Sequence, residues 1–114
     1  FAADHGERIF DNSTEWGRNL TWDRNDIRQQ FDIPFWIWAS PSYRSSRKQL
    51  WEQIRSCRNR RGMTDTIAQL LLHLAGIHSP WYYPQYDILH NDYDNSRKRI
   101  IRGERDYDRI MLAP

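Results

Sequence analysis

Phe31-Asp32-Ile33-Pro34-Phe35-Trp36-Ile37-Trp38-Ala39 is the stretch that decides the predicted fold. Its apolar side chains alternate on one face, and Trp36 and Trp38 make the other face apolar too. A strand that is apolar on both faces is typical of a sheet covered on both sides. Because Pro34 has no N–H to donate, we expect it near the strand start or at an edge. The stretch therefore predicts an α/β fold.

A first helix is predicted after this strand, from Ser46 to Gly62. Ser46 and Gln49 form a capping-box pattern, and Gly62 can end the helix. The apolar stripe of this helix consists of Leu50, Ile54 and Cys57. Cys57 is the single cysteine, so the chain has no internal disulfide framework, and its place on the stripe favours packing over a nucleophilic role.

A second helix is predicted over residues 64–76 and has the clearest helical pattern in the chain. Its apolar residues follow the i, i+3, i+4, i+7 spacing: Ile67, Leu70, Leu71 and Leu74. Gly76 marks its end. His73 lies one residue from the stripe, so we expect a partly buried structural histidine, and nothing positions a partner for His78 or His90. Further on, residues 100–101 are a short strand candidate.

The first thirty residues are mostly polar, and their pattern predicts little regular structure. Residues 1–7 look like the tail of a buried strand whose apolar body is expected to precede Phe1. Residues 11–30 are rich in Asn, Asp and Arg, with Gly17 as the expected turn. A loop of that length in a compact domain is often functional. Because the apolar body of the first strand is expected to precede Phe1, we expect this chain to be a fragment of a larger domain.

Composition excludes several classes of protein. The 114 residues carry a net charge of +2, and no apolar run approaches the ~20 residues of a membrane span. Arginine runs at residues 58–61 and 97–99 could contact phosphates, but acids are interleaved along most of the chain. A charge of +2 is not the excess of a nucleic-acid-binding protein, so we expect no nucleic-acid partner.

The tetrapeptide Asp4-His5-Gly6-Glu7 carries the strongest chemical signal. It stands where a strand ends, which is where ligand sites of open α/β sheets lie. A carboxylate and an imidazole can both bind Zn²⁺. Consecutive side chains of a regular strand point to opposite faces, so Asp4 and His5 reach one ion only if the backbone turns, which Gly6 permits. Two ligands do not complete a tetrahedral site, and the alternative is a surface Asp-His pair.

Ala3-Asp4-His5-Gly6-Glu7, followed by a polar loop and the stretch 31–40, closely resembles the C-terminal part of phosphoethanolamine transferases. These are zinc enzymes of the alkaline phosphatase/sulfatase superfamily. The order continues to match through the helix at residues 64–77 and through Tyr86-Asp87. Gly17-Arg18-Asn19 looks most like the branch that modifies the heptose of the lipopolysaccharide core. The resemblance covers nearly the whole chain.

The resemblance implies a fold, an activity and a location. The fold would be the C-terminal portion of an alkaline-phosphatase-like sheet with flanking helices, spanning residues 1–114 as part of one catalytic domain. The parent protein would be anchored upstream in the inner membrane of a Gram-negative bacterium, with its catalytic domain in the periplasm. It would move phosphoethanolamine from phosphatidylethanolamine to lipopolysaccharide, on core heptose or lipid A, through a phospho-threonine. That threonine and a further acidic ligand would lie in earlier segments.

The resemblance also assigns roles to residues of this chain. The residues that align with Asp4 and His5 are zinc ligands in the family. We expect Glu7 to orient them from the second shell of the metal. Many relatives that modify lipid A have a further histidine after this motif, and none stands between His5 and His73 here. Arg18 is the expected substitute because a guanidinium also holds a phosphate oxygen, with Asn19 beside it; the alternative for Arg18 is a solvated loop arginine.

Other functions remain open at this point. Within the superfamily, a sulfatase or phosphodiesterase would be distinguished by the nucleophile segment. A non-catalytic, Arg-rich binding module is the alternative from a different class. The isolated fragment is expected to be inactive, and its strand with two apolar faces predicts self-association.

Overall fold

The computed structural model describes residues 1–10, 16–18 and 22–112 of the chain. It is a mixed helical and β structure with small antiparallel sheets, in general agreement with a fold that combines helices and strands. The chain divides into two compact units, one formed by Phe1–Trp38 with Ile100–Pro114 and the other by Ala39–Arg99. We call them the terminal unit and the central unit. No alkaline-phosphatase-like sheet is present among the described residues.

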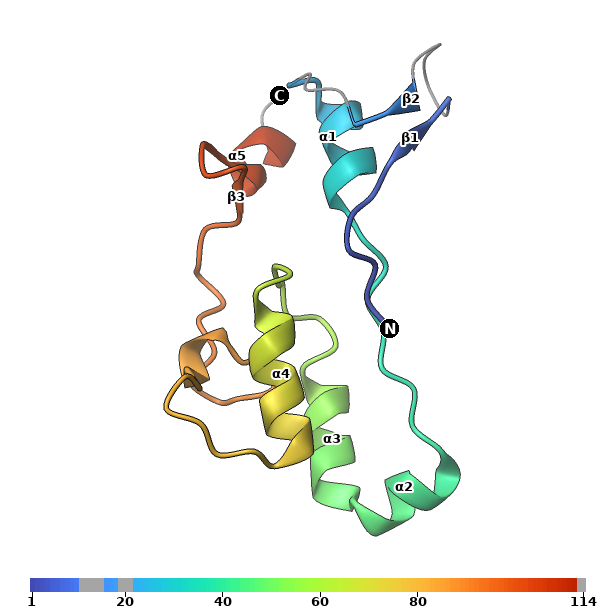
Figure 1. Cartoon of the computed structure of the whole chain (residues 1–114), viewed down its shortest axis with the longest axis vertical. Helices are drawn as coiled ribbons and strands as arrows, with labels where there is room; N and C mark the ends of the chain where they lie inside the picture. Colours follow the sequence, from blue (N-terminus) through green and yellow to red (C-terminus); the bar gives the residue numbers. More distant parts are fainter. Residues whose placement is uncertain (11–15, 19–21, 113–114) are drawn as a thin grey trace. The chain divides into compact units, whose positions relative to one another are not determined.

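The terminal unit begins with β1 (Arg8–Ile9), which pairs antiparallel with β2 (Trp16–Gly17), and continues into α1 (Arg24–Phe31) (Figure 1). The carboxylate of Asp23 caps α1 by accepting hydrogen bonds from the backbone N–H groups of residues 25 and 26. An aspartate N-cap satisfies donors that have no partner within the helix. A polar stretch that was predicted to be a loop therefore contains a helix.

The predicted strand at residues 31–39 is wrong. Phe31 ends α1, and residues 32–40 are irregular apart from an isolated antiparallel bridge between Ala2 and Phe35. Ile27 and Phe31 stand four residues apart on α1, so they share a helix face, and Phe31 packs against the core that contains Ile27. Helical packing therefore outweighs the alternating pattern at Phe31, and Pro34 lacks the donor that a regular strand ladder requires.

The rest of the terminal unit is a hairpin and a short helix near the C-terminus. Strand β3 (Ile100–Ile101), which the sequence predicts, pairs antiparallel with β4 (Arg105–Asp106), and α5 (Tyr107–Leu112) follows directly. The core of this unit is formed by Ile27, Ile101 and Tyr107 with partly buried Trp22, Phe31, Ile110 and Met111. This core joins α1 to the hairpin and to α5.

The central unit contains α2 (Pro41–Ser46), α3 (Lys48–Ser56), α4 (Thr66–Ala75) and the 3-10 helix η1 (Pro84–Tyr86). The predicted capping box at Ser46 is wrong. The hydroxyl of Ser40 instead caps α2 by accepting from the N–H of Tyr43, and α3 has no side-chain cap. Pro41 follows this cap at the first turn, where a missing N–H costs nothing.

The two longer helices of the central unit end differently from each other. Helix α3 ends at Ser56, earlier than the predicted Gly62. Helix α4 ends at Ala75 and is followed by Gly76, the predicted end signal, which caps the helix in the left-handed conformation with φ 65°. Within the predicted stripe of α4, Leu70 is buried but Leu71 is exposed. Other buried side chains of this unit are those of Cys57, Thr66, Asp87, Ile88, Leu89 and Tyr93.

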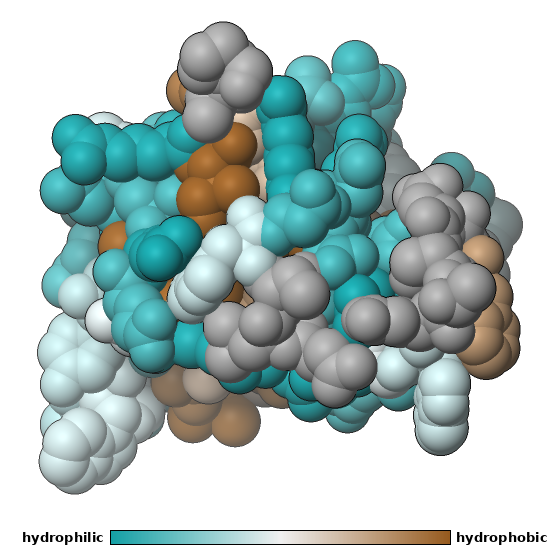
Figure 2. Space-filling view, turned by 90° about the horizontal axis from the view of Figure 1, so that it is seen from above, coloured by the Kyte–Doolittle hydropathy of each residue, from teal (hydrophilic) through white to brown (hydrophobic). Residues whose placement is uncertain are grey.

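One face of the molecule is predominantly polar (Figure 2). The space-filling view shows a face on which hydrophilic residues predominate and apolar residues form small separate groups (Figure 2). This agrees with a mean hydropathy of -0.94. Within the described ranges, no helix is both long and apolar enough to cross a membrane.

Candidate functional site

Residues 1–3 and 34–36 lie next to each other in the terminal unit. The N–H of Ala3 donates to the carbonyl of Pro34 at 3.2 Å, and the N–H of Trp36 donates to the carbonyl of Phe1 at 3.0 Å. The ring of Phe1 also stacks on that of Trp36, with 5.5 Å between the centroids. Residues 1–3 and 34–36 are thus held together, and Asp4 and His5 follow directly.

Asp4 and His5 direct polar atoms toward each other. Nε2 of His5 lies 3.5 Å from Oδ2 of Asp4, and the backbone N–H of His5 donates to Oδ1 of Asp4 at 3.1 Å. The Asp4 side chain is almost fully exposed, and the His5 side chain is 36% exposed. The two groups are therefore open to a ligand from solution.

The residue after His5 packs closely against the backbone of α1. The N–H of Gly6 donates to the carbonyl of Gln30 at 3.0 Å, and an added Cβ on Gly6 would lie 2.1 Å from the backbone oxygen of Gln29. No side chain fits in that space without a backbone shift. The backbone of Gly6 approaches the last turn of α1 too closely for a side chain to fit without a shift.

The hydrogen bond of the His5 ring determines which ring nitrogen is available to bind a metal ion. Nδ1 lies 3.0 Å from the carbonyl oxygen of Gly6. A carbonyl only accepts, so Nδ1 carries the hydrogen, and in the neutral imidazole Nε2 then presents a lone pair. Histidines that bind metals commonly donate their other N–H to a backbone carbonyl in this way.

The separation of the two ligand atoms fits a shared zinc ion. Bonds of about 2.0–2.1 Å at a tetrahedral angle place two ligand atoms about 3.3 Å apart. The observed separation of Nε2 and Oδ2 is 3.5 Å. Asp4 and His5 thus fit two positions of a zinc shell, and no group of three potential metal-ligating side chains occurs in the described part of the chain.

Glu7 and Arg18 are brought to the same end of the β1–β2 pair. The register of that pair sets Arg8 opposite Gly17, so Glu7 and Arg18 stand at the next opposed positions. Both are exposed, and an added Cβ on Gly17 would lie 3.9 Å from Oε1 of Glu7. Among the described residues, no hydrogen bond joins Glu7 to Asp4 or His5. Asn19 lies outside the described residues.

A buried ion pair that sequence reasoning missed holds this region in place. Arg8 is 2% exposed, and its Nη1 donates to Oδ2 of Asp26 at 2.8 Å, while its Nε donates to the carbonyl of Gly17 at 3.3 Å. One guanidinium therefore joins β1, β2 and α1. Sequence spacing gives no signal of a pair 18 residues apart.

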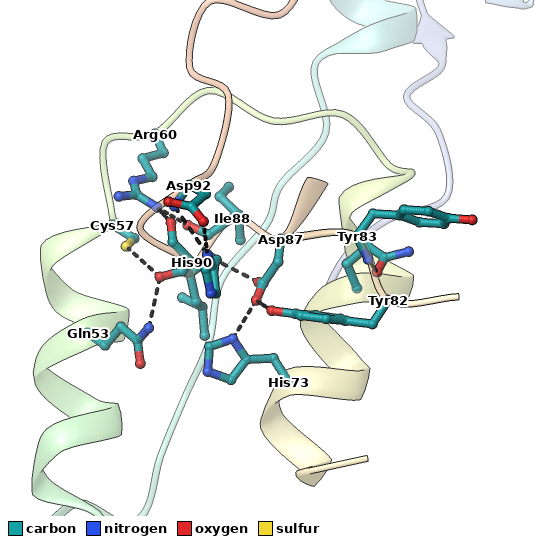
Figure 3. Close-up of polar contacts among 12 residues, drawn as sticks. Gln53, Cys57, Arg60, His73, Tyr82, Tyr83, Asp87, Ile88, His90 and Asp92 are labelled. Atoms are coloured by element: carbon teal, nitrogen blue, oxygen red, sulfur yellow. Dashed lines mark hydrogen bonds and ion pairs between the residues drawn. The ribbon is translucent and has the colours of Figure 1, made fainter. Parts of the chain in front are cut away.

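The central unit contains a second polar cluster around Asp87, a residue with no exposed surface (Figure 3). Oδ2 of Asp87 contacts Nδ1 of His73 and accepts a hydrogen bond from the hydroxyl of Tyr82 at 2.5 Å. Oδ1 accepts from the N–H of Leu89 at 3.0 Å. Burial, together with the hydrogen bond to Asp87 and its charge, raises the pKa of Tyr82.

The segment that follows Asp87 is held by side chains from α3 and the turn after it. Gln53 donates to the carbonyl of Leu89 at 2.9 Å, and Arg60 donates to the carbonyls of Ile88 and His90. Cys57 is buried against the same carbonyl of Leu89, at 3.8 Å, which agrees with its predicted packing role. The cluster is thus a satisfied network that fixes the loop.

The remaining histidines are placed as follows. His73 is partly buried, as predicted, because it contacts Asp87. His78 is exposed, and Nδ1 of His90 accepts from the N–H of Asp92 at 3.1 Å. Asp87 was not recognised as the partner of His73 because it is 14 residues away in a loop.

Comparisons with known proteins identify no relative. No family model, no curated protein and no solved structure matches this chain.

Proposed function

We propose that this chain is the C-terminal part of a zinc-dependent phosphoethanolamine transferase, with a fold derived from the alkaline-phosphatase-like sheet. The parent enzyme would transfer phosphoethanolamine from phosphatidylethanolamine to lipopolysaccharide from a periplasmic domain of an inner-membrane protein. The observation that supports this proposal most is the pair of Asp4 and His5, whose ligand atoms lie 3.5 Å apart. That distance is close to the separation that one zinc ion requires.

Each residue of the site has a role in this proposal. Asp4 and His5 hold the metal, and the hydrogen bond from Nδ1 of His5 to the Gly6 carbonyl fixes the ring so that Nε2 faces the ion. When bound, zinc polarises a phosphoryl oxygen and activates a nucleophile. Arg18 binds a phosphate oxygen through its guanidinium, with Asn19 beside it.

The position of Glu7 changes its proposed role. Its carboxylate lies near Gly17, on the side of the β1–β2 pair where Arg18 stands, and not in hydrogen-bond contact with His5 among the described residues. Glu7 therefore orients Arg18 by charge and acts on the metal ligands only through the backbone between them. A carboxylate and a guanidinium at opposed positions of a strand pair attract each other.

The proposal is tested with an assay for the release of diacylglycerol from phosphatidylethanolamine. The chain alone is expected to give no turnover, because phosphoryl transfer requires the nucleophile and all ligands placed together. In the longer protein, Asp4→Ala and His5→Ala are expected to abolish transfer, while Asp92→Ala and His78→Ala, at exposed positions of the central unit, retain it. Turnover by the chain alone, or full activity of the His5→Ala protein, would overturn the proposal.

A further inference from the structure

The two short helices at the start of the central unit present a basic surface. It comprises Arg44 of α2, Arg47 between the helices, and Lys48, Trp51 and Arg55 of α3, and we call it the basic face. Lys48, Trp51 and Arg55 recur at spacings of three and four, so they share one side of α3. The guanidinium of Arg44 lies 5.6 Å from the ring centroid of Trp51, which places α2 beside that side.

Charge is divided unequally between the two units of the chain. The central unit has ten Lys and Arg against five Asp and Glu, a net +5, whereas the terminal unit has seven against ten, a net -3. The overall charge of +2 conceals this difference. A concentration of one sign of charge on one unit indicates an interaction with a partner of the opposite sign.

The cations of the basic face make few polar contacts within the central unit. Residues 39–99 are all described, and within them the only ion pair of the face joins Arg55 to Glu52 at 3.2 Å, with both side chains exposed. An exposed pair of this kind contributes little to stability. Helix α2 has no buried residue. The face is thus open to solvent.

Other arginines of the same unit have structural roles. Arg60 donates to two backbone carbonyls, and Arg97 pairs with Asp65 and lies over the ring of Tyr86. These contacts fix loops of the unit. Arg44, Arg47 and Lys48 have no such carbonyl or carboxylate partner within residues 39–99.

We propose that the basic face binds the anionic surface of a lipid bilayer. The occupant is argued from charge complementarity and from the aromatic side chains of Tyr43 and Trp51 among the cations. Helices that lie at a bilayer surface typically combine Lys and Arg with aromatic or aliphatic side chains. Each basic residue near such a surface strengthens binding by about fivefold. A nucleic acid can also bind cations that stand beside aromatic side chains, because bases stack on aromatic rings, and it is the competing outcome of the test.

The proposal is tested by co-sedimentation of the full chain with vesicles. One set contains phosphatidylglycerol and phosphatidylcholine, and the other contains phosphatidylcholine alone. The test protein is the triple variant Arg44→Gln/Lys48→Gln/Arg55→Gln. Its matched control removes three exposed charges elsewhere, in Arg28→Gln/Lys98→Gln/Arg109→Gln. Circular dichroism checks that both variants keep the helical content of the wild type.

We expect the wild-type chain to bind the anionic vesicles and not those of phosphatidylcholine. The basic-face variant should bind the anionic vesicles at least tenfold more weakly, and the control within about twofold of the wild type. Equal losses in both variants would overturn the proposal, since net charge alone would then explain binding. Failure to bind anionic vesicles would also overturn it, as would binding to a duplex DNA oligonucleotide in place of vesicles. The test measures no enzymatic activity, so its outcome is independent of the proposed transferase.

Discussion

The guanidinium of Arg8 lies 2.8 Å from the carboxylate of Asp26 and joins β1 to α1. Arg8 is three residues after His5, and Asp26 precedes the residues of α1 against which Gly6 turns. This ion pair therefore supports the geometry of the Asp4–His5 pair without contacting either residue.

Asp26→Ala is expected to destabilise the terminal unit by roughly 3–5 kcal/mol, because it removes a carboxylate that pairs with the buried cation of Arg8. The matched control is Asp32→Ala, which removes a carboxylate that pairs with exposed Arg28 and accepts a hydrogen bond from Tyr107. Because the Asp32 side chain is 46% exposed, its loss should cost less stability than the loss of Asp26. Urea denaturation compares the two variants with the wild type. Equal stability of the Asp26→Ala chain and the wild type would show that the pair is not a significant stabilising contact.

Gly6→Ala should cost more stability than Gly103→Ala. A methyl group on Gly6 would overlap the backbone oxygen of Gln29. A methyl group on Gly103 would meet no neighbouring atom and would only strain the backbone, whose φ is 72°. Backbone strain at Gly103 is worth about 1–2 kcal/mol, and an overlap with backbone adds a displacement of the chain. Thermal melts of the two variants measure the difference. Similar melting temperatures would contradict the close approach at Gly6.

Sequence reasoning succeeded where the signal is local. The spacing of apolar residues and the position of Gly76 predict α4 closely, and residues 100–101 are a strand as predicted. Adjacent Asp4 and His5 also place their polar atoms 3.5 Å apart, as a pair of neighbouring residues can. These features depend on neighbours a few residues away.

It failed where distant contacts decide the structure. The alternation at residues 31–39 predicts a strand. Helix α1, which Asp23 caps, instead continues to Phe31, because Phe31 packs against the core of the terminal unit. The Asp87 cluster and the Arg8–Asp26 pair join residues far apart in sequence. A single aspartate in a polar loop carries no spacing pattern that distinguishes it from a solvated one.

The raised pKa of Tyr82 predicts a loss of stability at alkaline pH. Because the folded pKa lies above the ordinary value of 10.0, the unfolded chain loses this proton first as pH rises. The contribution is therefore present below pH 10.0 and is lost as pH rises above it. Tyr82→Phe should show a smaller decrease in urea midpoint between about pH 8 and about pH 11.

Tyr82→Phe should also lower stability at neutral pH by about 1 kcal/mol, because Asp87 loses one donor. Tyr43→Phe is the matched control, since its hydroxyl has no hydrogen bond within residues 39–99. A Tyr82→Phe chain with the same alkaline decrease as the wild type would contradict the role of the Asp87 contact.

Self-association of the chain is expected at the paired segments 1–3 and 34–36. Trp36 and Trp38 are 54% and 72% exposed, and the backbone around the isolated Ala2–Phe35 bridge can pair further. Exposed apolar side chains next to open backbone edges favour pairing with a second copy. Sedimentation across a concentration series should show a dimer that Trp36→Ser/Trp38→Ser weakens and that Trp81→Ser, at another exposed tryptophan, leaves unchanged. A monomer at high concentration would contradict this expectation.

Calorimetric titration of zinc into the chain tests the central claim most directly. With two ligands and water completing the shell, we expect binding well below the affinity of a closed four-ligand site. His5→Ala should abolish this binding, and His78→Ala, at an exposed histidine of the other unit, should leave it unchanged. Zinc binding that survives His5→Ala, or tight nanomolar binding that is lost in His78→Ala, would contradict the assignment of Asp4 and His5 as the metal ligands.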